Sequence, residues 1–226
     1  MASTDSNVVA AFDLDGTLAK GGSVFKWLCA VAGRRHAYRA ALSLALPLAM
    51  GAIRSGRHAD EAKERLFRRL LAGRTLDEVK DQSRVFAVDH LATYGRALVL
   101  ERLRWHQAQG HDVVIVSASP QLYVDVIADE LGVRAGIGTC LAVDVRGRLT
   151  GGYLGRNCRG SEKLRRLREW IETRGYRGDP ILYAYGNSRG DRRLLLAATY
   201  PYDVGQLGPL GALRHFPRLT SLTAGE

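Results

Sequence analysis

The 226-residue sequence has few residues of several kinds: three cysteines, two methionines and five lysines, with aromatic residues at only 8%. The cysteines Cys29, Cys140 and Cys158 are odd in number, widely spaced and form no CxxC pair. This pattern argues against both a disulfide framework and a cysteine-based zinc site. We expect all three to be small residues of the core.

The sequence also lacks a long hydrophobic run. Its longest stretch without a charge, AALSLALPLAMGAI at residues 40–53, has 14 residues and contains Pro47. A helix that spans a bilayer needs about 20 apolar residues, so this stretch is too short. Residues 1–7, MASTDSN, lack the basic and then apolar pattern of a signal peptide. We therefore expect a cytoplasmic protein, with peripheral contact with an anionic membrane as an open alternative.

Negative charge is in deficit, with 23 acidic residues against 33 lysines and arginines and a formal net charge of +10. Such a balance is compatible with an acidic substrate, a phosphate-rich surface or nucleic acid. The sequence contains no zinc-finger pattern, no heptad run and no basic motif interleaved with aromatic residues. We therefore do not expect nucleic-acid binding, and a small phosphorylated substrate fits the charge better.

Apolar residues make up 46% of the chain, and they form short runs typical of buried parallel strands. The runs are VVAAF (8–12), DVVIVS (112–117), ILYAY (181–185) and a weaker one, YPYDVG (200–205). Amphipathic helical patterns lie between these runs. Strands that alternate with helices predict an α/β fold with a Rossmann-like parallel sheet, whose ligands bind at the carboxyl ends of the strands.

The spacing of the first two strands indicates an insertion. From Asp15 to Ser117 there are 102 positions, whereas a complete βαβ unit needs only about 30 residues. Helical patterns occur at 23–33, around 36–53, at 59–73 and at 75–88. We predict an α/β core formed by residues 1–18 and 89–226, with an all-helical cap at 19–88. A β-hairpin turning at Arg146 and Gly147 is expected as a modest excursion from the sheet.

The segment DLDGT, residues 13–17, follows the first buried strand and carries two carboxylates one residue apart. Two like charges at a strand end are unfavourable unless a cation lies between them. Mg²⁺ prefers oxygen ligands and would offset this repulsion. Asp13 and Asp15 are therefore candidate metal ligands, with one of them free to act as a nucleophile and the other as a proton donor. The alternative is an ordinary polar turn at a strand end.

DLDGT resembles the first motif of the haloacid dehalogenase superfamily of aspartate-nucleophile phosphatases. The inserted helices after it are similar to the cap of the phosphoserine phosphatase-like subfamily IB. The resemblance implies that Asp13 is the nucleophile, that Asp15 is the general acid and base, and that Mg²⁺ is the cofactor.

Three later segments match the expected motifs of this superfamily. VSASP supplies Ser117 and Ala118 for substrate binding, although Ser117 by itself could be an ordinary strand-end hydroxyl. RGSEKL supplies Lys163 as a catalytic and substrate-binding cation, and this residue is the only lysine after Lys80. YGNSRGD has Asn187 where the superfamily often has aspartate, and Asp191 four residues later. The resemblance implies that Asn187 and Asp191 complete the metal site with one carboxylate fewer than usual.

The implied function is a Mg²⁺-dependent phosphatase that hydrolyses a phosphomonoester through an aspartyl-phosphate intermediate. Phosphoserine is an alternative substrate, but Gly22 occupies the position, nine residues after Asp13, where phosphoserine phosphatases carry glutamate. A lipid phosphate is a second alternative. Its basis is the apolar run at 40–53, which is flanked by His36, Arg39, Arg54 and Arg57. The cap and the RGSEKL stretch also resemble the bacterial phosphatidylglycerophosphate phosphatases of this superfamily, although those have longer apolar caps. A non-catalytic phosphate-binding module is the third alternative, because Asn187 removes a charge from the site.

Overall fold

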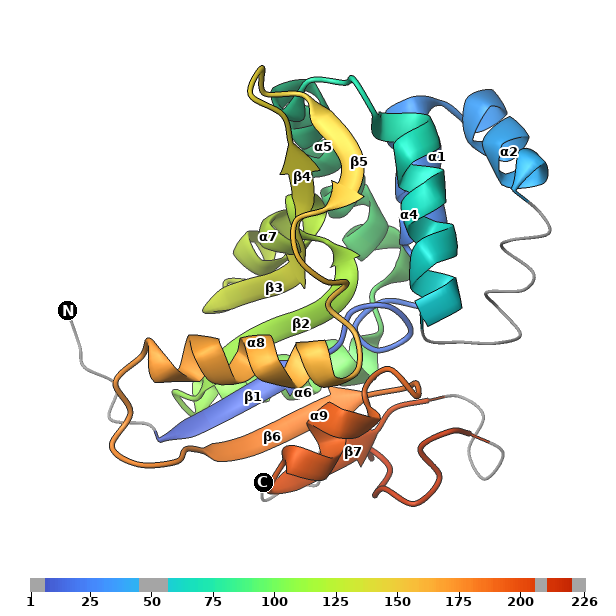
Figure 1. The fold of residues 1–226 in the computed structure, drawn as a ribbon. Helices are drawn as coiled ribbons and strands as arrows, with labels where there is room; N and C mark the ends of the chain where they lie inside the picture. Colours follow the sequence, from blue (N-terminus) through green and yellow to red (C-terminus); the bar gives the residue numbers. More distant parts are fainter. Residues whose placement is uncertain (1–6, 45–56, 206–210, 221–226) are drawn as a thin grey trace.

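A parallel β-sheet forms the centre of the protein (Figure 1). The computed structural model describes residues 7–44, 57–205 and 211–220, without the side chains of residues 57–59. The five strands lie in the order β3-β2-β1-β6-β7, and every pair of neighbours is parallel. Their bounds are β1 Val8–Phe12, β2 Asp112–Pro120, β3 Ala135–Thr139, β6 Ile181–Gly186 and β7 Tyr200–Asp203. The predicted α/β fold with a Rossmann-like sheet is confirmed, and β3 is the one strand of this sheet that the sequence patterns did not predict.

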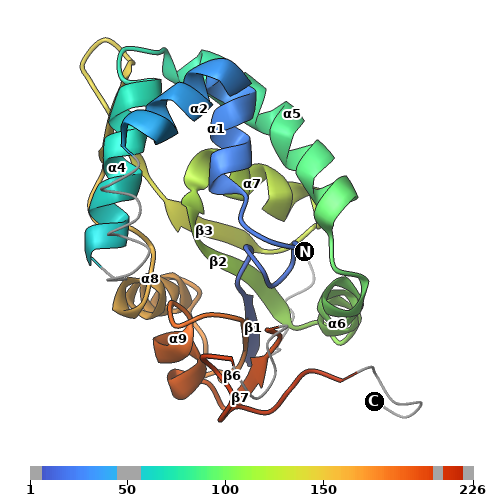
Figure 2. The ribbon, with the colours of Figure 1, turned by 90° about the vertical axis from the view of Figure 1, so that its right-hand side faces the viewer.

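Helices cover both faces of the sheet (Figure 2). Helices α6 (Ala97–Ala108) and α7 (Gln121–Glu130) pack on one face, and α8 (Ser161–Glu172) and α9 (Arg192–Ala197) pack on the other. Side chains alternate along β1, so that Ala10 and Phe12 join the apolar cluster on the first face while Val9 and Ala11 join the cluster on the second. Because both faces are buried, the strands are apolar throughout, as the sequence indicated.

A cap of four described helices lies above the carboxyl end of β1. They are α1 (Val24–Ala32), α2 (Arg34–Ser43), α4 (Arg57–Leu71) and α5 (Leu76–Tyr94). The predicted boundaries between cap and core remain a prediction, and the boundary placed at residue 88 falls inside α5. No helix in the described part of the chain is long and apolar enough to cross a membrane.

The predicted hairpin is present as β4 (Leu141–Val143) and β5 (Leu149–Tyr153), but its position differs from the prediction. It belongs to the cap rather than to an edge of the sheet, because β5 packs against α4. Gly151 makes this contact possible, since a Cβ atom there would lie 2.3 Å from the Cα of Arg68. The backbone of Leu149 also exchanges hydrogen bonds with the loop before α5, at Gly73 and Arg74. The cap is therefore helical with an added two-stranded sheet.

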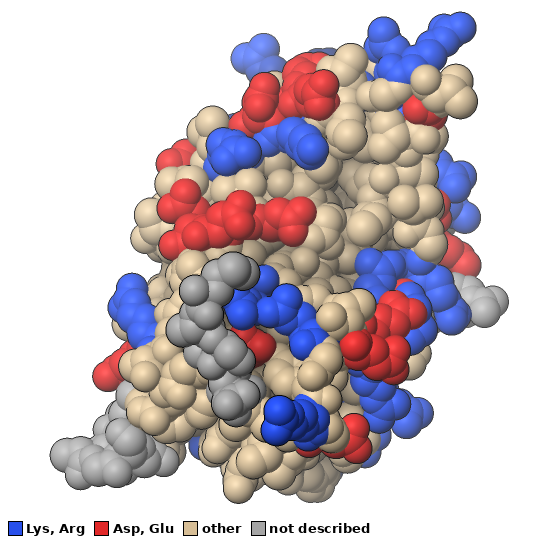
Figure 3. Space-filling view, turned by 90° about the vertical axis from the view of Figure 1, so that its left-hand side faces the viewer, with Lys and Arg blue, Asp and Glu red and all other residues tan. Residues whose placement is uncertain are grey.

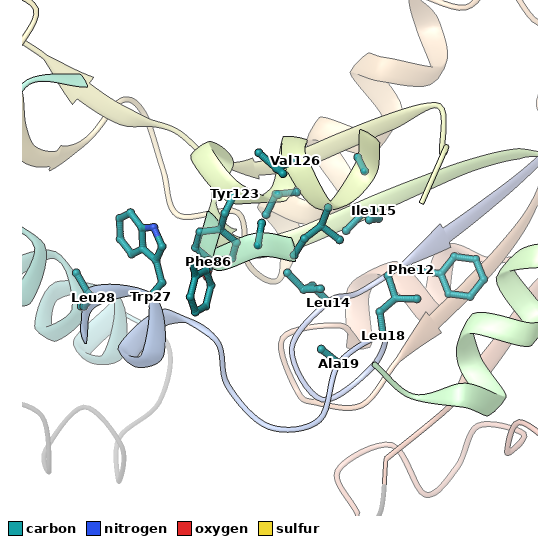
Figure 4. Packing of buried hydrophobic residues seen from close by; sticks show 14 of the residues in the cluster. Phe12, Leu14, Leu18, Ala19, Trp27, Leu28, Phe86, Ile115, Tyr123 and Val126 are labelled. Atoms are coloured by element: carbon teal, nitrogen blue, oxygen red, sulfur yellow. The ribbon is translucent and has the colours of Figure 1, made fainter. Parts of the chain in front are cut away.

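One apolar cluster runs without interruption from the core into the cap (Figure 4). Phe12 and Ile115 contribute to it from the sheet, and Trp27 and Phe86 contribute from α1 and α5. Tyr123 of α7 lies between the two groups, with its ring centroid 5.5 Å from that of Trp27 and 5.3 Å from that of Phe86. Burial of this surface holds the cap against the core.

The chain enters the helical part of the cap after β1 and leaves it before α6, and these two crossings are hydrogen-bonded to each other. Ala19 and Gly95 form an antiparallel bridge. The N–H of Lys20 donates to Tyr94 O at 2.8 Å, and the N–H of Arg96 donates to Leu18 O at 2.9 Å. This paired segment, residues 18–20 and 94–96, is the hinge between the two parts.

The positive net charge is not spread evenly over the surface. On the face drawn in Figure 3, acidic side chains form a band that separates groups of basic ones. A duplex bound along this face would meet both signs of charge, whereas nucleic-acid sites need a continuous basic stripe. This face therefore gives no support to nucleic-acid binding.

Candidate active site

Most of the sequence-predicted site residues lie on or directly after three adjacent strands that end at the same edge of the sheet, while Lys163 and Asp191 lie at the starts of α8 and α9. Phe12 pairs with Ile115 of β2 and with Tyr185 of β6, so Asp13 leaves β1 level with the ends of both neighbours. Ser117 lies near the end of β2, and Asn187 directly follows β6. Because β1 lies between β2 and β6 in the sheet, segments more than 100 residues apart in the sequence meet at this edge.

The loop after β1 turns tightly enough to present both carboxylates. The N–H groups of Thr17 and Ala19 donate to Leu14 O, and the N–H of Leu18 donates to Asp13 O. Gly16 has φ +81°, and a Cβ atom on it would lie 2.1 Å from Nδ2 of Asn187. Only glycine satisfies both the backbone conformation and this close approach.

Lys163 lies between two buried carboxylates. Its Nζ donates to Asp13 Oδ1 at 2.6 Å and to Asp191 Oδ1 at 2.5 Å, and its side chain is only 2% exposed. The lysine is near the start of α8, while Asp191 precedes α9. Two charges of one sign and one of the other are thus buried together, and the ion pairs offset the cost of removing the ammonium from water.

This cluster changes the pKa of each member. Burial and the negative charge of Asp191 raise the pKa of Asp13 to about 7, although Lys163 acts in the opposite direction. Burial would lower the pKa of Lys163, but Asp13 and Asp191 outweigh it and raise that pKa. Burial would likewise raise the pKa of Asp191, whereas Lys163 and Ser188 lower it. The lysine is therefore held in its charged form, and additional positive charge near Asp13 would favour the carboxylate.

Oxygen atoms converge on the other side of Asp13. One of the two terminal atoms of the Asn187 side-chain amide, either its oxygen or its nitrogen, lies 3.3 Å from Asp13 Oδ2 and 3.1 Å from the backbone carbonyl oxygen of Asp15. When this atom is the amide nitrogen, it donates to both oxygens; when it is Oδ1, three acceptors face one another. A hard divalent cation stabilises the second orientation, because carboxylate, carbonyl and amide oxygens are its preferred ligands. The donor set therefore fits Mg²⁺.

The fit depends on a backbone oxygen and an amide as well as on a carboxylate. Among the residues that the structure describes, no group of three His, Cys, Asp or Glu side chains is arranged to hold a metal. Thr17 Oγ1 also donates to Asp13 Oδ2, at 3.0 Å, which fixes this carboxylate oxygen. The site is thus poorer in charge than one built from several carboxylates.

The Asp15 side chain points away from this oxygen cluster and toward the cap. The N–H of Ser23 donates to its Oδ1 at 2.7 Å, and Ser119 Oγ donates to its Oδ2 at 2.6 Å. Ser23 Oγ is in turn 2.7 Å from the hydroxyl of Tyr123. Asp15 therefore offers its carbonyl to the oxygen cluster and its carboxylate to a different region, next to the hydroxyl groups.

Ser117 is 1% exposed, and its hydroxyl oxygen accepts a hydrogen bond from the N–H of Ser119 at 3.1 Å. Ala118 is the next residue of β2, and its carbonyl oxygen is within hydrogen-bond distance of Thr139 Oγ1 and Lys63 Nζ, both at 2.8 Å. The segment 117–119, where the pairing of β2 with β3 shifts register, is therefore fixed by contacts from the sheet and from the cap. Because Ser117 uses its oxygen as an acceptor, its hydroxyl hydrogen can be donated to a ligand.

Sequence reasoning did not identify Lys63, Ser23 or Arg96 as parts of this region. Arg96 Nη1 donates to Gly16 O at 2.6 Å and to Val204 O at 2.8 Å, which links the turn after β1 to the hinge. Burial lowers the pKa of Lys63 to about 8, against the opposing effect of Asp60 and Asp15. The scarcity of lysine, which drew attention to Lys163, was the available signal for Lys63. Nothing in the sequence distinguished Ser23 and Arg96 from other serines and arginines.

The candidate catalytic groups Asp13 and Lys163 are buried in this structure. A cavity of about 510 Å³ opens beside them, between α4 and the loops that precede α8 and α9. Its walls combine carboxylates of the cap (Asp60, Glu61, Glu64) with arginines of the core (Arg156, Arg159, Arg189). Asp13 and Lys163 do not line it, and they are only 5% and 2% exposed. A ligand that reaches Asp13 therefore needs the cap to move.

The sequence matches the haloacid dehalogenase-like hydrolase family over residues 10–196. The chain belongs to this family. The buried Asp13–Lys163 pair at the end of the central strand, beneath a cap inserted after the first motif, agrees with that assignment.

Two curated relatives are informative. Protein CicA of Caulobacter vibrioides is 34% identical over 193 residues, which covers 84% of this chain and 83% of that protein. Histidinol-phosphatase of Neisseria meningitidis is 25% identical over 136 residues, with 59% and 61% of the two chains covered. The first match extends through both the core and the cap.

Solved structures show the same fold. A Bordetella pertussis protein described as of unknown function has a TM-score of 0.73 at 26% identity, with 88% of this chain and 90% of that chain covered. A phosphoserine phosphatase in the form of a phospho-aspartyl intermediate analogue has a TM-score of 0.60 at 17% identity, with 86% and 85% covered. At that identity the second likeness concerns the fold alone.

Proposed function

We propose that this protein is a Mg²⁺-dependent phosphomonoesterase that works through an aspartyl phosphate on Asp13. The observation that carries the proposal is the contact of Lys163 Nζ with Asp13 Oδ1 at 2.6 Å, with Asn187 and the Asp15 carbonyl on the opposite side of the same carboxylate. A carboxylate between a fixed cation and an oxygen cluster is arranged to attack a phosphorus atom while the charge of the phosphoryl oxygens is neutralised.

Each residue then has a defined task. Asp13 attacks the phosphorus in line, and Asp15 protonates the oxygen of the leaving alcohol. In the second half-reaction Asp15 takes a proton from the water that hydrolyses the aspartyl phosphate. Lys163, the Ser117 hydroxyl and the backbone at Ala118 bind the phosphoryl oxygens.

Mg²⁺, when bound, supplies positive charge that offsets the repulsion between the attacking carboxylate and the phosphoryl oxygens. Asp13, the Asp15 carbonyl and the Asn187 side chain are the residues that would hold it. We assign Asp191 a positioning role rather than direct coordination. Its Oδ1 accepts from Lys163, and its Oδ2 accepts from the Ser188 hydroxyl at 2.8 Å and from the Ser188 N–H at 3.0 Å.

The substrate class follows in part from the cavity beside the site. Its walls present both carboxylates and guanidinium groups, so a leaving group that is itself polar or zwitterionic would find partners there. A small phosphorylated metabolite fits this description better than a large apolar one. Histidinol phosphate and phosphoserine are suitable members of a test panel because the similar proteins named above act on such amino compounds or are named for them.

The direct test is hydrolysis of p-nitrophenyl phosphate by the purified protein, with Mg²⁺ and with EDTA in its place. We expect turnover that requires Mg²⁺ in the wild type and none above background in Asp13→Asn, which keeps the shape of the side chain but removes the nucleophile. Arg69→Gln, an exposed change on α4, is the matched control and should keep wild-type activity. Turnover by Asp13→Asn at the wild-type rate would contradict the proposal.

A lipid phosphate remains a second candidate, favoured by one observation. Helix α2 carries Arg34, Arg35 and Arg39 on its exposed surface, where Tyr38 and Leu42 are also 57% and 78% exposed. Cations beside exposed apolar side chains suit the surface of an anionic membrane. Most of the apolar run at 40–53 lies outside the described residues. Sedimentation with anionic vesicles at low and high salt tests this candidate, and an absence of binding at both would remove it.

A further inference from the structure

Lys63 is a cap residue whose side chain reaches the core. It lies on α4, is partly buried, and donates from Nζ to Ala118 O at 2.8 Å and to Asn157 Oδ1 at 2.7 Å. Both acceptors are outside the cap helices, and Ala118 follows Ser117 in the last part of β2. An ammonium carried by the cap thus contacts the backbone of this strand segment directly.

The carbonyl oxygen of Ala118 belongs to the peptide group between Ala118 and Ser119, which is linked by hydrogen bonds to both Ser117 and Asp15. The peptide that carries Ala118 O also carries the N–H of Ser119, and this N–H donates to Ser117 Oγ at 3.1 Å. The hydroxyl of the same Ser119 donates to Asp15 Oδ2 at 2.6 Å. A cation on the carbonyl end of a peptide polarises it and strengthens the bond made by its N–H end. The Lys63 ammonium is therefore two hydrogen bonds away from Ser117 and two away from Asp15.

The partners of Lys63 are themselves fixed across the cap boundary. Thr139 Oγ1 lies within hydrogen-bond distance of the same two acceptors, Ala118 O at 2.8 Å and Asn157 Oδ1 at 2.9 Å, and its single hydrogen is shared between them. Asn157 Nδ2 donates to Asp60 Oδ1 at 2.5 Å, one turn before Lys63 on α4. The cluster of Asp60, Lys63, Thr139 and Asn157 therefore forms only when α4 is seated on the core.

We propose that Lys63 is a positioning residue that couples closure of the cap to the phosphate-binding segment at residues 117–119 of β2. When α4 closes, the ammonium fixes the 118–119 peptide, which aims the Ser117 hydroxyl at the phosphoryl oxygens and holds Ser119 against Asp15. When the cap opens, this segment loses the Lys63 donor and its hold on the phosphoryl group weakens. The inference rests on the proposed phosphatase function, and it adds a means by which the cap controls binding in the core.

Lys63 has two alternative roles: a purely structural contact between cap and core, or direct binding of the leaving group. The two roles predict different effects on stability, on phosphate affinity and on KM. A structural contact changes the stability of the fold without changing the affinity for phosphate. Direct binding of a leaving group changes the KM of substrates that carry an acidic leaving group, but it leaves inorganic phosphate unaffected, since this ligand has no leaving group.

The test uses full-length Lys63→Met, with Lys63→Arg as the conservative variant and Arg69→Gln as a control on the same helix. We measure kcat and KM for p-nitrophenyl phosphate, the inhibition constant of inorganic phosphate, and Tm. Loss of a charge-assisted bond to a fixed carbonyl predicts that kcat falls about 10- to 50-fold in Lys63→Met and that phosphate inhibition weakens about as much. Lys63→Arg should recover most of both, and Arg69→Gln should match the wild type.

A second variant protects the test from a folding defect. Thr139→Val removes the other donor to Ala118 O while leaving Lys63 in place, so we expect smaller losses, about 3- to 10-fold, in the same two quantities. Retention of the wild-type kcat and phosphate inhibition constant in Lys63→Met, within about twofold, overturns the proposal, whatever happens to Tm. If the wild type neither hydrolyses the ester nor binds phosphate, the phosphatase function itself has failed, which is a different result.

Discussion

The carboxylate of Asp13 has two oxygens in different surroundings. Oδ1 contacts the Lys163 ammonium, and Oδ2 faces Thr17, Asn187 and the Asp15 carbonyl. Burial and Asp191 raise the pKa of Asp13. Without further positive charge in the site, the ionised form of this carboxyl group is therefore less favourable than it would be in water. A divalent cation bound beside Oδ2, as we propose, would favour the ionised carboxylate that the proposed attack requires.

Asn187→Asp tests the charge of the proposed metal site. A carboxylate in place of the amide adds one negative charge next to Asp13 Oδ2 and the Asp15 carbonyl, which should strengthen the binding of Mg²⁺. We expect the Mg²⁺ concentration that gives half-maximal kcat/KM to fall about tenfold, equivalent to ~1.4 kcal/mol. Asn187→Ala should raise it. A titration of activity with Mg²⁺ measures both, and equal half-maximal concentrations in all three proteins would exclude Asn187 as a ligand.

Asp15→Asn tests the division of labour between the two carboxylates. A good leaving group such as p-nitrophenolate departs without a proton, whereas an alkyl alcohol needs one from Asp15. We therefore expect kcat/KM for an alkyl phosphate to fall by about 10²- to 10⁴-fold, and by much less for p-nitrophenyl phosphate. Because kcat/KM reports on the first half-reaction, the shared hydrolysis step does not obscure the comparison. Equal losses on the two substrates would contradict the role of Asp15 as acid.

The sequence motifs identified some residues of this site but did not identify Lys63. Asp13, Asp15, Lys163 and Asn187 follow strands or begin a helix within recognisable motifs, and the fold brings them together as those motifs predict. Lys63 is different, because it has no motif and its partners Ala118 and Asn157 lie 55 and 94 residues away in sequence. Its contacts depend on how α4 is seated on the core, which no local pattern encodes.

At the level of the loops, the turn after β1 depends on Gly16. Its φ of +81° lies in the left-handed region, and a Cβ atom would lie 2.1 Å from Asn187 Nδ2. We expect Gly16→Ala to lose about 1–2 kcal/mol of unfolding free energy from its backbone conformation. We also expect it to need several-fold more Mg²⁺, because Asn187 is displaced from the oxygen cluster. Urea denaturation and a Mg²⁺ titration measure the two effects separately.

Gly21 provides the matched control for this prediction. It also has a positive φ, +70°, but a Cβ atom there would meet nothing within 4 Å. Gly21→Ala should therefore show a similar backbone penalty while keeping the Mg²⁺ requirement of the wild type. The prediction for Gly16 would be wrong if both variants had the same Mg²⁺ requirement.

The strand β3 shows why some elements could not be predicted from local sequence. Its sequence AGIGT contains two glycines, which are poor strand formers. The structure explains them: a Cβ atom on Gly136 would lie 2.9 Å from Val124 O, and one on Gly138 would lie 2.8 Å from the Cα of Gln121. Close packing under α7 thus requires residues whose propensity argues against a strand. The hairpin β4–β5 was predicted from its turn, but its place on the cap depends on Gly151 and α4 in the same way.

The stability of the protein as a unit should depend on pH through a buried histidine. His106 of α6 is fully buried, with Nε2 2.8 Å from the Tyr185 hydroxyl and Nδ1 2.7 Å from His111 Nδ1. Tyr185 stacks on Phe12, the residue before the proposed nucleophile, at a centroid distance of 4.2 Å. Burial, His111 and Arg102 together lower the pKa of His106 from 6.5 to about 3. Its neutral form is therefore part of the packing behind β1.

The sign of the pH dependence follows from linkage. Between pH 6.5 and about 3 the unfolded chain binds a proton on His106 and the folded protein does not, so the unfolding free energy falls as the pH falls. Above pH 6.5 this residue contributes no slope. One such group changes the unfolding free energy by at most ~1.4 kcal/mol per pH unit, and other titratable groups add their own pH dependence. The useful measurement is therefore a difference between the wild type and a variant that lacks the imidazole.

We expect His106→Gln to be less stable than the wild type at pH 7.5, because it loses packing against the aromatic residues, and the deficit should shrink by more than ~1 kcal/mol by pH 5. Urea denaturation at intervals between these pH values gives both curves. His36→Gln, an exposed change on α2, is the control and should run parallel to the wild type. A deficit in His106→Gln that stays constant across the range would mean that the folded protein accepts a proton in this region, either on His106 or on the adjoining His111, and that the buried pair opens at mildly acidic pH.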